Sequence, residues 1–129
     1  MKVAELTGAQ LDYWVARADG RGADEVEIID QGANPVSPRF YASFTRTGAV
    51  WWPSSKWNQG GPIIEREQIA IETGGEGKDN PRPPTWYAIC DGIFDRGQGH
   101  QGEGPTPLIA AMRAYVASKF GDEVPDEAG

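Results

Sequence analysis

Residues 50–67 read Val-Trp-Trp-Pro-Ser-Ser-Lys-Trp-Asn-Gln-Gly-Gly-Pro-Ile-Ile-Glu-Arg-Glu, and the rest of this 129-residue chain is organised around them. The residue before a proline is disfavoured in helical conformation, so we expect no helix to start ahead of Pro53. Ser54 or Ser55 is suited to cap a helix that begins near Lys56. The stretch therefore predicts an extended segment followed by a helix.

The Gly-Gly-Pro sequence at residues 60–62 leaves two arrangements open for that helix. One is a kinked helix over residues 55–66, and the other is a short turn followed by a helix with Pro62 at its first position. We favour a helical segment interrupted at Gly60–Gly61, because glycine and proline both weaken a helix interior. Ile63 and Ile64 then anchor the segment to the core.

Helices are also predicted at the two ends of the chain. Over residues 8–18, Thr7 and Gln10 form a capping box, and apolar residues recur at helical spacing. The helix near the C-terminal end has Thr106 as N-cap and Pro107 at its first position, and Gly121 ends it. Four strands are expected from alternating or β-branched patterns, at residues 25–30, 40–45, 68–73 and 85–90. Glycine-rich loops are expected at residues 74–84 and 97–104.

This order predicts an α+β fold, with one small, mainly antiparallel sheet of about four strands and three helices packed on it, in the order α-β-β-α-β-β-α. The length fits a single domain, which we place at residues 1–121. Residues 122–129 contain four acidic residues and no basic one. We expect them to form an acidic flexible tail.

Composition excludes several functional classes. The formal net charge of −7 argues against general nucleic-acid binding, which needs a basic face. The single cysteine, Cys90, excludes an intramolecular disulfide. No apolar run is long enough to span a bilayer, and no signal peptide is recognisable, so we expect a soluble intracellular protein without a membrane partner.

Catalytic and metal-binding patterns are absent or incomplete. Residues 74–79 resemble a phosphate-binding loop but lack its first glycine and its Ser or Thr. The single histidine, His100, has no further ligands at a recognisable spacing, and Cys90 lies on a half-buried strand. We expect no catalytic set, no metal and no cofactor, although the sequence does not decide whether the protein is an enzyme.

One region has the composition of a binding site. Residues 31–64 contain no acidic residue and three cations, Arg39, Arg46 and Lys56, and three of the five tryptophans fall within this region. Aromatic faces, hydroxyls and a glycine turn suit a small ligand, but they also suit a packed loop, and both interpretations stay open. The candidate ligand-binding residues are Trp51, Trp52, Ser54, Ser55, Trp57, Asn58, Gly60, Gly61, Arg46, Arg66 and Arg113.

Two long motifs resemble the NinX family of tailed bacteriophages. They are Trp-x-Pro-Ser-x-x-Trp-x-Gln-Gly-Gly-Pro-Ile-Ile-Glu-Arg-Glu at residues 51–67 and Gly-Pro-Thr-Pro-Leu-Ile-Ala-Ala-Met-Arg-Ala-Tyr-Val-Ala-Ser-Lys-Phe-Gly-Asp-Glu-Val at residues 104–124. A weaker likeness joins the chain to small phage domains described as an α-β-α sandwich. The resemblance implies a short phage protein of undefined biochemical role, in the cytoplasm of the infected bacterial host. Arg66 and Arg113 have no structural explanation in these motifs, and they meet if the second and third helices are neighbours.

The leading hypothesis is a non-enzymatic phage accessory protein that binds a small anionic ligand. In the phage context this ligand is a nucleotide-type host defence signal, sequestered by a homo-oligomer. The alternative is a protein-interaction module that binds and modulates a host or phage protein, with the tryptophans as anchors.

Overall fold

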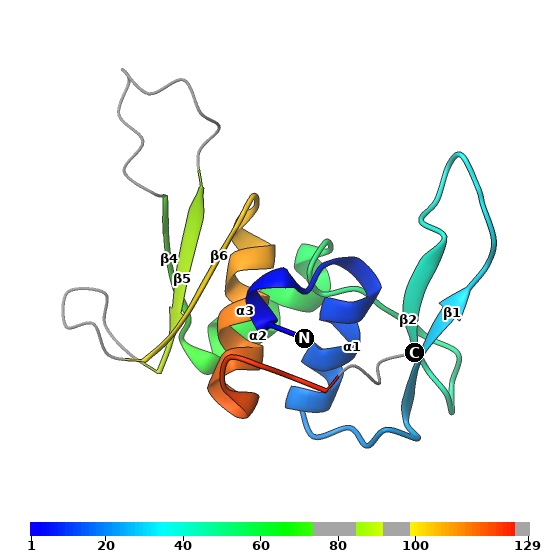
Figure 1. Ribbon diagram of the computed structural model, residues 1–129, viewed down its shortest axis with the longest axis horizontal. Coiled ribbons are helices and arrows are strands. Elements are labelled where there is room, and N and C mark those ends of the chain that lie inside the picture. The colour runs from blue at the N-terminus through cyan, green and yellow to red at the C-terminus, as the bar shows by residue number, and fades with distance from the viewer. Residues whose placement is uncertain (74–84, 92–98, 126–129) are drawn as a thin grey trace.

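Two small antiparallel sheets flank three helices in the computed structural model, which describes residues 1–73, 85–91 and 99–125 (Figure 1). The first sheet has the order β1-β2-β3 and the second has the order β4-β5-β6. The helices are α1 (Gly8–Ala18), α2 (Trp57–Glu67) and α3 (Pro107–Phe120), preceded by the 3-10 turn η1 (Val3–Glu5). The strands are β1 (Val26–Asp30), β2 (Phe40–Phe44), β3 (Val50–Trp51), β4 (Ala70–Thr73), β5 (Trp86–Cys90) and β6 (His100–Gly104).

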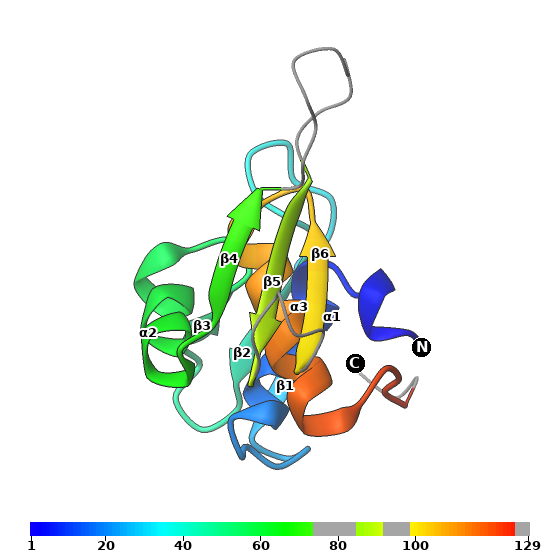
Figure 2. The same ribbon diagram turned by 90° about the vertical axis from the view of Figure 1, so that its left-hand side faces the viewer.

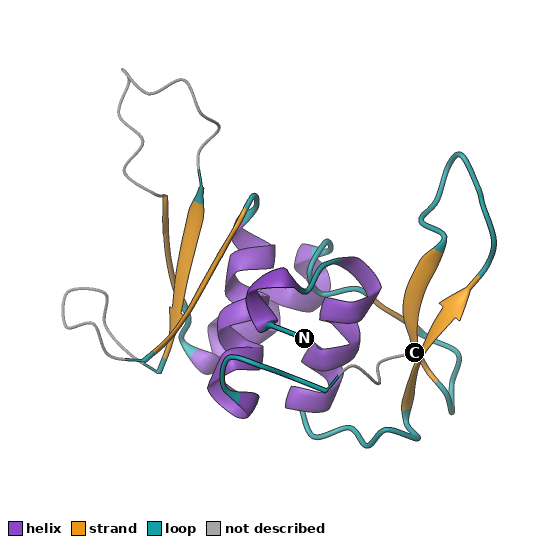
Figure 3. Cartoon of the chain, in the orientation of Figure 1, coloured by secondary structure: helices purple, strands orange, loops and turns teal. Residues whose placement is uncertain are grey.

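The helices form the middle layer of the molecule (Figure 3). α1 packs against the sheet β1-β2-β3, whereas α3 packs against β4-β5-β6 and also contacts α1 and α2. Figure 2 shows the second sheet covering α3 from the outside. The core contains the apolar residues of α1 and α3 together with buried residues of both sheets, such as Val26, Ala42 and Ala88.

The α+β class and the number and order of the helices are confirmed. The prediction of a single sheet is wrong, because the strands of the described residues form two sheets with the helices between them. The layers also differ from the α-β-α sandwich of the weaker likeness. The physical reason lies in α3, whose residues from Ala110 to Ala117 are all buried. A helix whose residues are buried on every side needs cover on every side, which one sheet cannot supply.

The first helix has the predicted bounds, but its capping box is wrong. Thr7 occupies the N-cap position with an extended backbone, yet its side chain makes no capping hydrogen bond. Gly8 follows with φ +53°, in the left-handed region. This first residue departs from the regular helical backbone that a capping box requires, and the reciprocal hydrogen bonds of a capping box are not made.

The second helix is continuous from Trp57 to Glu67, so the predicted interruption at Gly60–Gly61 is wrong. Lys56, and neither serine, stands at the N-cap. Gly60 allows the helix to touch its neighbours, since a Cβ there would lie 2.4 Å from the Pro53 carbonyl oxygen and 2.6 Å from Leu108 Cδ2. Tertiary packing therefore overrides the low helix propensity of this segment.

Two strands were missing from the sequence-based expectation. β3 has only two residues, and β6 occupies the second half of the predicted loop at residues 97–104; residues 92–98 and the loop at 74–84 lie outside the described part. In β6, a Cβ on Gly102 would lie 2.3 Å from the Ala110 carbonyl oxygen and 2.5 Å from the Ala114 nitrogen. Glycine is thus required here because the strand runs directly against the backbone of α3.

The last helix has the predicted caps. Thr106 accepts a hydrogen bond from the Ile109 amide at 3.1 Å, Pro107 opens the helix, and Gly121 ends it with φ +83°. Beyond Gly121, the first residues of the predicted acidic tail pair with the beginning of the chain. The Val3 amide donates to the Asp122 carbonyl at 2.9 Å, and the Val124 amide donates to the Met1 carbonyl at 2.9 Å. Val124 is buried, and residues 126–129 lie outside the described part.

Among the described residues, none of the helices combines the length and the apolar character that a bilayer crossing requires.

Candidate functional site

The tryptophan-rich segment is fixed by two polar side chains from neighbouring elements. The Gln59 side chain of α2 accepts a hydrogen bond from the Trp52 amide through Oε1 at 2.7 Å and donates one through Nε2 to the Val50 carbonyl at 3.1 Å. Asp12 of α1 accepts the Ser54 amide at 2.8 Å in a buried position. Burial raises the pKa of Asp12 to about 7, while the hydrogen bonds from Ser54 act in the opposite direction. Ser54 and Gly60 therefore have structural roles in this turn.

Other candidate residues of the segment lie on an exposed face. The Lys56 ammonium is 5.3 Å from the ring centroid of Trp52, within cation–π range. Trp57 is 56% exposed, and Ser55 and Asn58 are exposed beside it. Trp51 points the other way, with its ring 5.3 Å from that of Phe44, and its buried Nε1 has no hydrogen-bond partner in the described structure.

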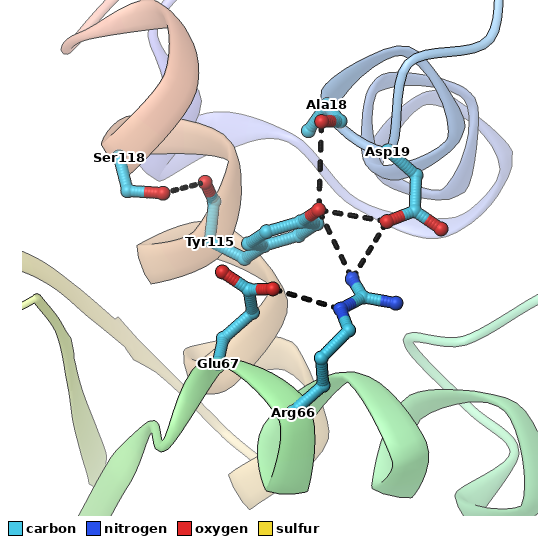
Figure 4. A network of polar contacts seen from close by, with 6 residues as sticks. All are labelled: Ala18, Asp19, Arg66, Glu67, Tyr115 and Ser118. Carbon is cyan, nitrogen blue, oxygen red and sulfur yellow. Dashed lines mark hydrogen bonds and ion pairs between the residues drawn. The ribbon is translucent and has the colours of Figure 1, made fainter.

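Arg66 is held by a network that joins all three helices (Figure 4). Its Nη2 donates to Asp19 Oδ1 at 2.6 Å and to the Tyr115 hydroxyl at 3.1 Å, and its Nε donates to Glu67 Oε2 at 2.7 Å. The Tyr115 hydroxyl in turn donates to Asp19 Oδ1 at 2.7 Å. The bond to Glu67 and the nearby carboxylates raise the pKa of Arg66. An incoming anion would have to displace two carboxylates here.

Arg66 and Arg113 do not meet, although the condition for their meeting is fulfilled, since α2 and α3 are neighbours. Arg66 reaches Tyr115, which follows Arg113 by two positions on α3. Two positions along a helix correspond to a rotation of roughly 200°, so the side chains of Arg113 and Tyr115 leave α3 on opposite sides. Arg46 lies apart from both, in the turn between β2 and β3, where it lines a cavity of about 340 Å³ together with Asp24 and Glu25.

Arg113 has the environment of an anion-binding group. It is only 9% exposed, and its Nε donates to the Leu6 carbonyl at 3.0 Å while its Nη1 donates to the Glu103 carbonyl at 2.7 Å. Its Nη2 has no hydrogen-bond partner among the residues that the structure describes, and no carboxylate of these residues forms an ion pair with it. Burial lowers the pKa of Arg113, which the Glu103 charge partly opposes.

A cavity of about 430 Å³ opens beside this guanidinium. Five parts of the chain line it: the N-terminal residues 2–4, β5, the edge strand β6, α3 and the residues that follow α3. The Gly102 contact described above holds β6 against α3, so that the Glu103 carbonyl reaches Arg113. The lining residues are Lys2, Val3, Ala4, Tyr87, Gln101, Gly102, Glu103, Arg113, Ala117, Asp122 and Glu123.

The cavity of Arg113 contrasts with a larger one of about 660 Å³ between α1 and the β1–β2 hairpin. That cavity is also lined by an arginine, Arg39, but the carboxylate of Asp30 already compensates its charge. Arg39 donates through Nε and Nη2 to the two oxygens of Asp30, at 2.9 and 3.0 Å. Of the arginines in these cavities, Arg113 alone combines burial with the lack of a carboxylate partner in the described part of the chain.

Comparison with protein families assigns the chain. A family model described as "Bacteriophage P22, NinX" matches residues 2–119. The chain belongs to the phage NinX family. The match includes α1, α2 and all of α3 except Phe120, so it covers Arg113 and the cavity except for Asp122 and Glu123, and it confirms the resemblance inferred from the two long motifs. No curated protein matches this NinX-family chain.

The sequence pointed to Arg113 but missed the rest of its cavity. Lys2, Tyr87 and the β6 residues Gln101 and Glu103 come from three segments far apart in the chain, and no local spacing unites these segments. A usable signal was the alternation of Gly102 and Gly104, which favours a strand packed against a backbone rather than a loop. Two residues considered for chemistry, His100 and Cys90, are cross-strand partners; His100 is exposed, and burial raises the pKa of the Cys90 thiol. Among the described residues, no three His, Cys, Asp or Glu side chains gather in a metal-binding group.

Proposed function

We propose that this NinX-family protein binds a small anionic ligand without catalysing a reaction, and that Arg113 holds the anion. The observation that carries the proposal is the environment of one guanidinium. Arg113 is only 9% exposed, two backbone carbonyls accept hydrogen bonds from its guanidinium, its Nη2 has no hydrogen-bond partner among the described residues, and the residue lines a cavity.

Electrostatics favours an anion at this position. A buried charge without a counter-ion is unfavourable, and the lowered pKa of Arg113 has burial as its main cause. A carboxylate or phosphate oxygen at Nη2 would compensate the charge through a charge-assisted hydrogen bond. The cavity volume of about 430 Å³ falls within the usual range for small-molecule sites.

The phage family favours a ligand that matters during infection. We therefore extend the proposal to a nucleotide-type host defence signal, which the protein would sequester in the cytoplasm of the infected bacterium. We further propose a homo-oligomer, which sedimentation equilibrium of the purified protein would detect as a mass above that of one chain. A monomer at all accessible concentrations would contradict this part alone.

Thermal-shift measurements with small carboxylates, phosphates and cyclic and linear nucleotides test the anion site. A ligand at 100 times its dissociation constant adds about 2.7 kcal/mol to the free energy of unfolding, which gives a clear rise in melting temperature. We expect this rise in the wild type and in an Arg46→Met variant, and its loss in Arg113→Met. Equal rises in all three proteins would contradict the assignment to Arg113.

The Arg113→Met change also removes two hydrogen bonds that join α3 to Leu6 and to Glu103, so a measurement on the wild type complements it. The Arg113 Nε–H group gives its own signal in nitrogen–proton NMR spectra. We expect this signal to shift when an anion binds at the neighbouring Nη2. Stabilisation by a ligand without any shift of this signal would place the ligand elsewhere.

A specific observation supports a second candidate, a protein-interaction surface. Trp57 is exposed at the start of α2, next to the Trp52–Lys56 pair, and none of the three cavities described above includes these residues. Exposed tryptophans are frequent anchors of protein interfaces. A pull-down from phage-infected cells would test this: a stoichiometric partner should be lost with Trp57→Ala and kept with Val36→Ala, which removes another exposed apolar side chain. Equal recovery with both variants would exclude Trp57 as an anchor.

A further inference from the structure

The cavity beside Arg113 has different charges at its floor and at its rim. Of the lining residues, Val3, Arg113 and Ala117 are buried, and Arg113 is the only charged one among these three; we call the buried lining residues the floor and the exposed ones the rim. The exposed residues of the rim include one cation and three acidic residues, Lys2, Glu103, Asp122 and Glu123. A cationic floor thus lies beneath a rim with an excess of negative charge.

We propose that the ligand of this cavity carries a single negative charge at one end and an amino group at the other. This inference rests on the proposed function, since it assumes that Arg113 holds the anionic end. The amino end, either a charged ammonium or a neutral hydrogen-bond donor, would face the acidic rim. Two chemical sources fit this description, an amino acid with separated charges and a singly charged cyclic nucleotide with an amino group on its base.

The charges of the rim select against highly charged anions. All groups around a cavity of this size lie within about one Debye length, roughly 8 Å at physiological salt, so the rim carboxylates act on any ligand inside. One buried guanidinium compensates one negative charge well. A second or third negative charge would lie nearer to the rim, where three acids outnumber one lysine. A charged ammonium placed there is attracted to the carboxylates instead, and a neutral amino group can donate a hydrogen bond to one of them.

The position of the rim acids also explains why they do not neutralise Arg113 themselves. None of the three forms an ion pair with its guanidinium in the described structure. Glu103 affects its pKa through space, and its backbone carbonyl, not its carboxylate, accepts from Nη1. The charge of Arg113 is therefore left for a ligand, while the carboxylates are left for a donor on that ligand.

Matched pairs of probes test the inference on the full chain. γ-Aminobutyrate and butyrate differ by an amino group, and cyclic AMP and the cyclic monophosphate of purine riboside differ only by the amino group of the base. AMP carries one more negative charge than cyclic AMP. Affinities would be measured by calorimetry, and the Arg113 Nε–H signal would report whether each probe reaches the floor of the cavity.

We expect the amino-bearing member of at least one pair to bind about fivefold more tightly than its partner, which corresponds to one partly exposed ionic contact. The pair that shows this preference identifies the source of the ligand, and AMP should bind more weakly than cyclic AMP. In a Glu103→Gln/Glu123→Gln variant, the preference for the amino group should fall below about twofold. Both substituted side chains are exposed, so the fold should be retained.

Three outcomes would overturn the inference, and they differ in what they leave standing. Equal affinities within both pairs, with a shifted Arg113 signal, would refute the amino group and retain the anion site. An unchanged preference in the double variant would refute the role of the rim. If none of the probes shifts the Arg113 signal, the anion site itself is refuted, and the inference fails with it.

Discussion

Replacing Asp12 by asparagine should make the protein more stable at pH 8 and remove a pH dependence of its stability. Asp12 is 3% exposed, and burial raises its pKa from 3.8 to about 7. Because the folded-state pKa is higher than the unfolded one, the folded state retains the proton more strongly. The resulting stabilisation is fully present below about pH 4, decreases between pH 4 and pH 7, and is absent above pH 7.

The magnitude follows from the pKa difference. A shift from 3.8 to about 7 corresponds to at most about 4 kcal/mol in the free energy of unfolding, at roughly 1.4 kcal/mol per pKa unit. Asparagine has nearly the shape of the protonated carboxyl, remains neutral at every pH, and keeps an oxygen that can accept the Ser54 amide. The variant should therefore match the wild type near pH 4 and exceed it by up to that amount at pH 8.

Urea unfolding followed by tryptophan fluorescence, at constant ionic strength between pH 4 and pH 8, measures this difference. Asp30→Asn is the matched control, since Asp30 is exposed and the hydrogen bond from Arg39 lowers its pKa. It should give no gain at high pH. Parallel stability curves for Asp12→Asn and the wild type, or a loss of stability of the variant at pH 8, would refute the assignment of a raised pKa to Asp12.

Five further substitutions test the packing, the helix caps and the polar network of the fold by the same unfolding assay. Gly102→Ala should cost about 2 kcal/mol or more, because the new Cβ collides with the backbone of α3, whereas Gly61→Ala, with its nearest neighbour atom at 3.9 Å, should stabilise α2 by up to about 1 kcal/mol. Thr106→Ala should cost about 1 kcal/mol, and Thr7→Ala should cost clearly less, because only the first threonine caps its helix with its side chain; equal losses would contradict the observed caps. Tyr115→Phe should cost about 1–2 kcal/mol, since the hydroxyl bridges Asp19 and Arg66; an unchanged stability would show that the network adds nothing to the fold.

Local patterns in the sequence predicted the local structure well. The helix from Gly8 to Ala18 and the cap formed by Thr106 and Pro107 follow from signals within a few residues. The antiparallel pairing of residues 26–30 with residues 40–44 likewise follows from strand propensity and proximity in the chain. Such features depend on interactions between near neighbours, which a single sequence displays directly.

Features that depend on distant contacts were not predictable in this way. The helix through Gly60 and Pro62 is continuous because Pro53 and Leu108 pack against it, and β6 is a strand because α3 accepts its glycines. The candidate site shows the same division. Arg113 was identified from its motif, but the cavity beside it is assembled from both ends of the chain and from β6, and only the folded structure brings these together.

The central position of α3 has a consequence for the synthesis of the protein on the ribosome. This helix supports the sheet β4-β5-β6 and contacts α1, yet it is the last helix of the sequence to be made. At bacterial elongation rates of roughly 5–20 residues per second, about 5 to 20 seconds separate the end of α1 from the end of α3. During that interval the side of α1 that contacts α3 has no partner, so the nascent chain should be a target for chaperones and should complete its folding only after residue 120 has emerged.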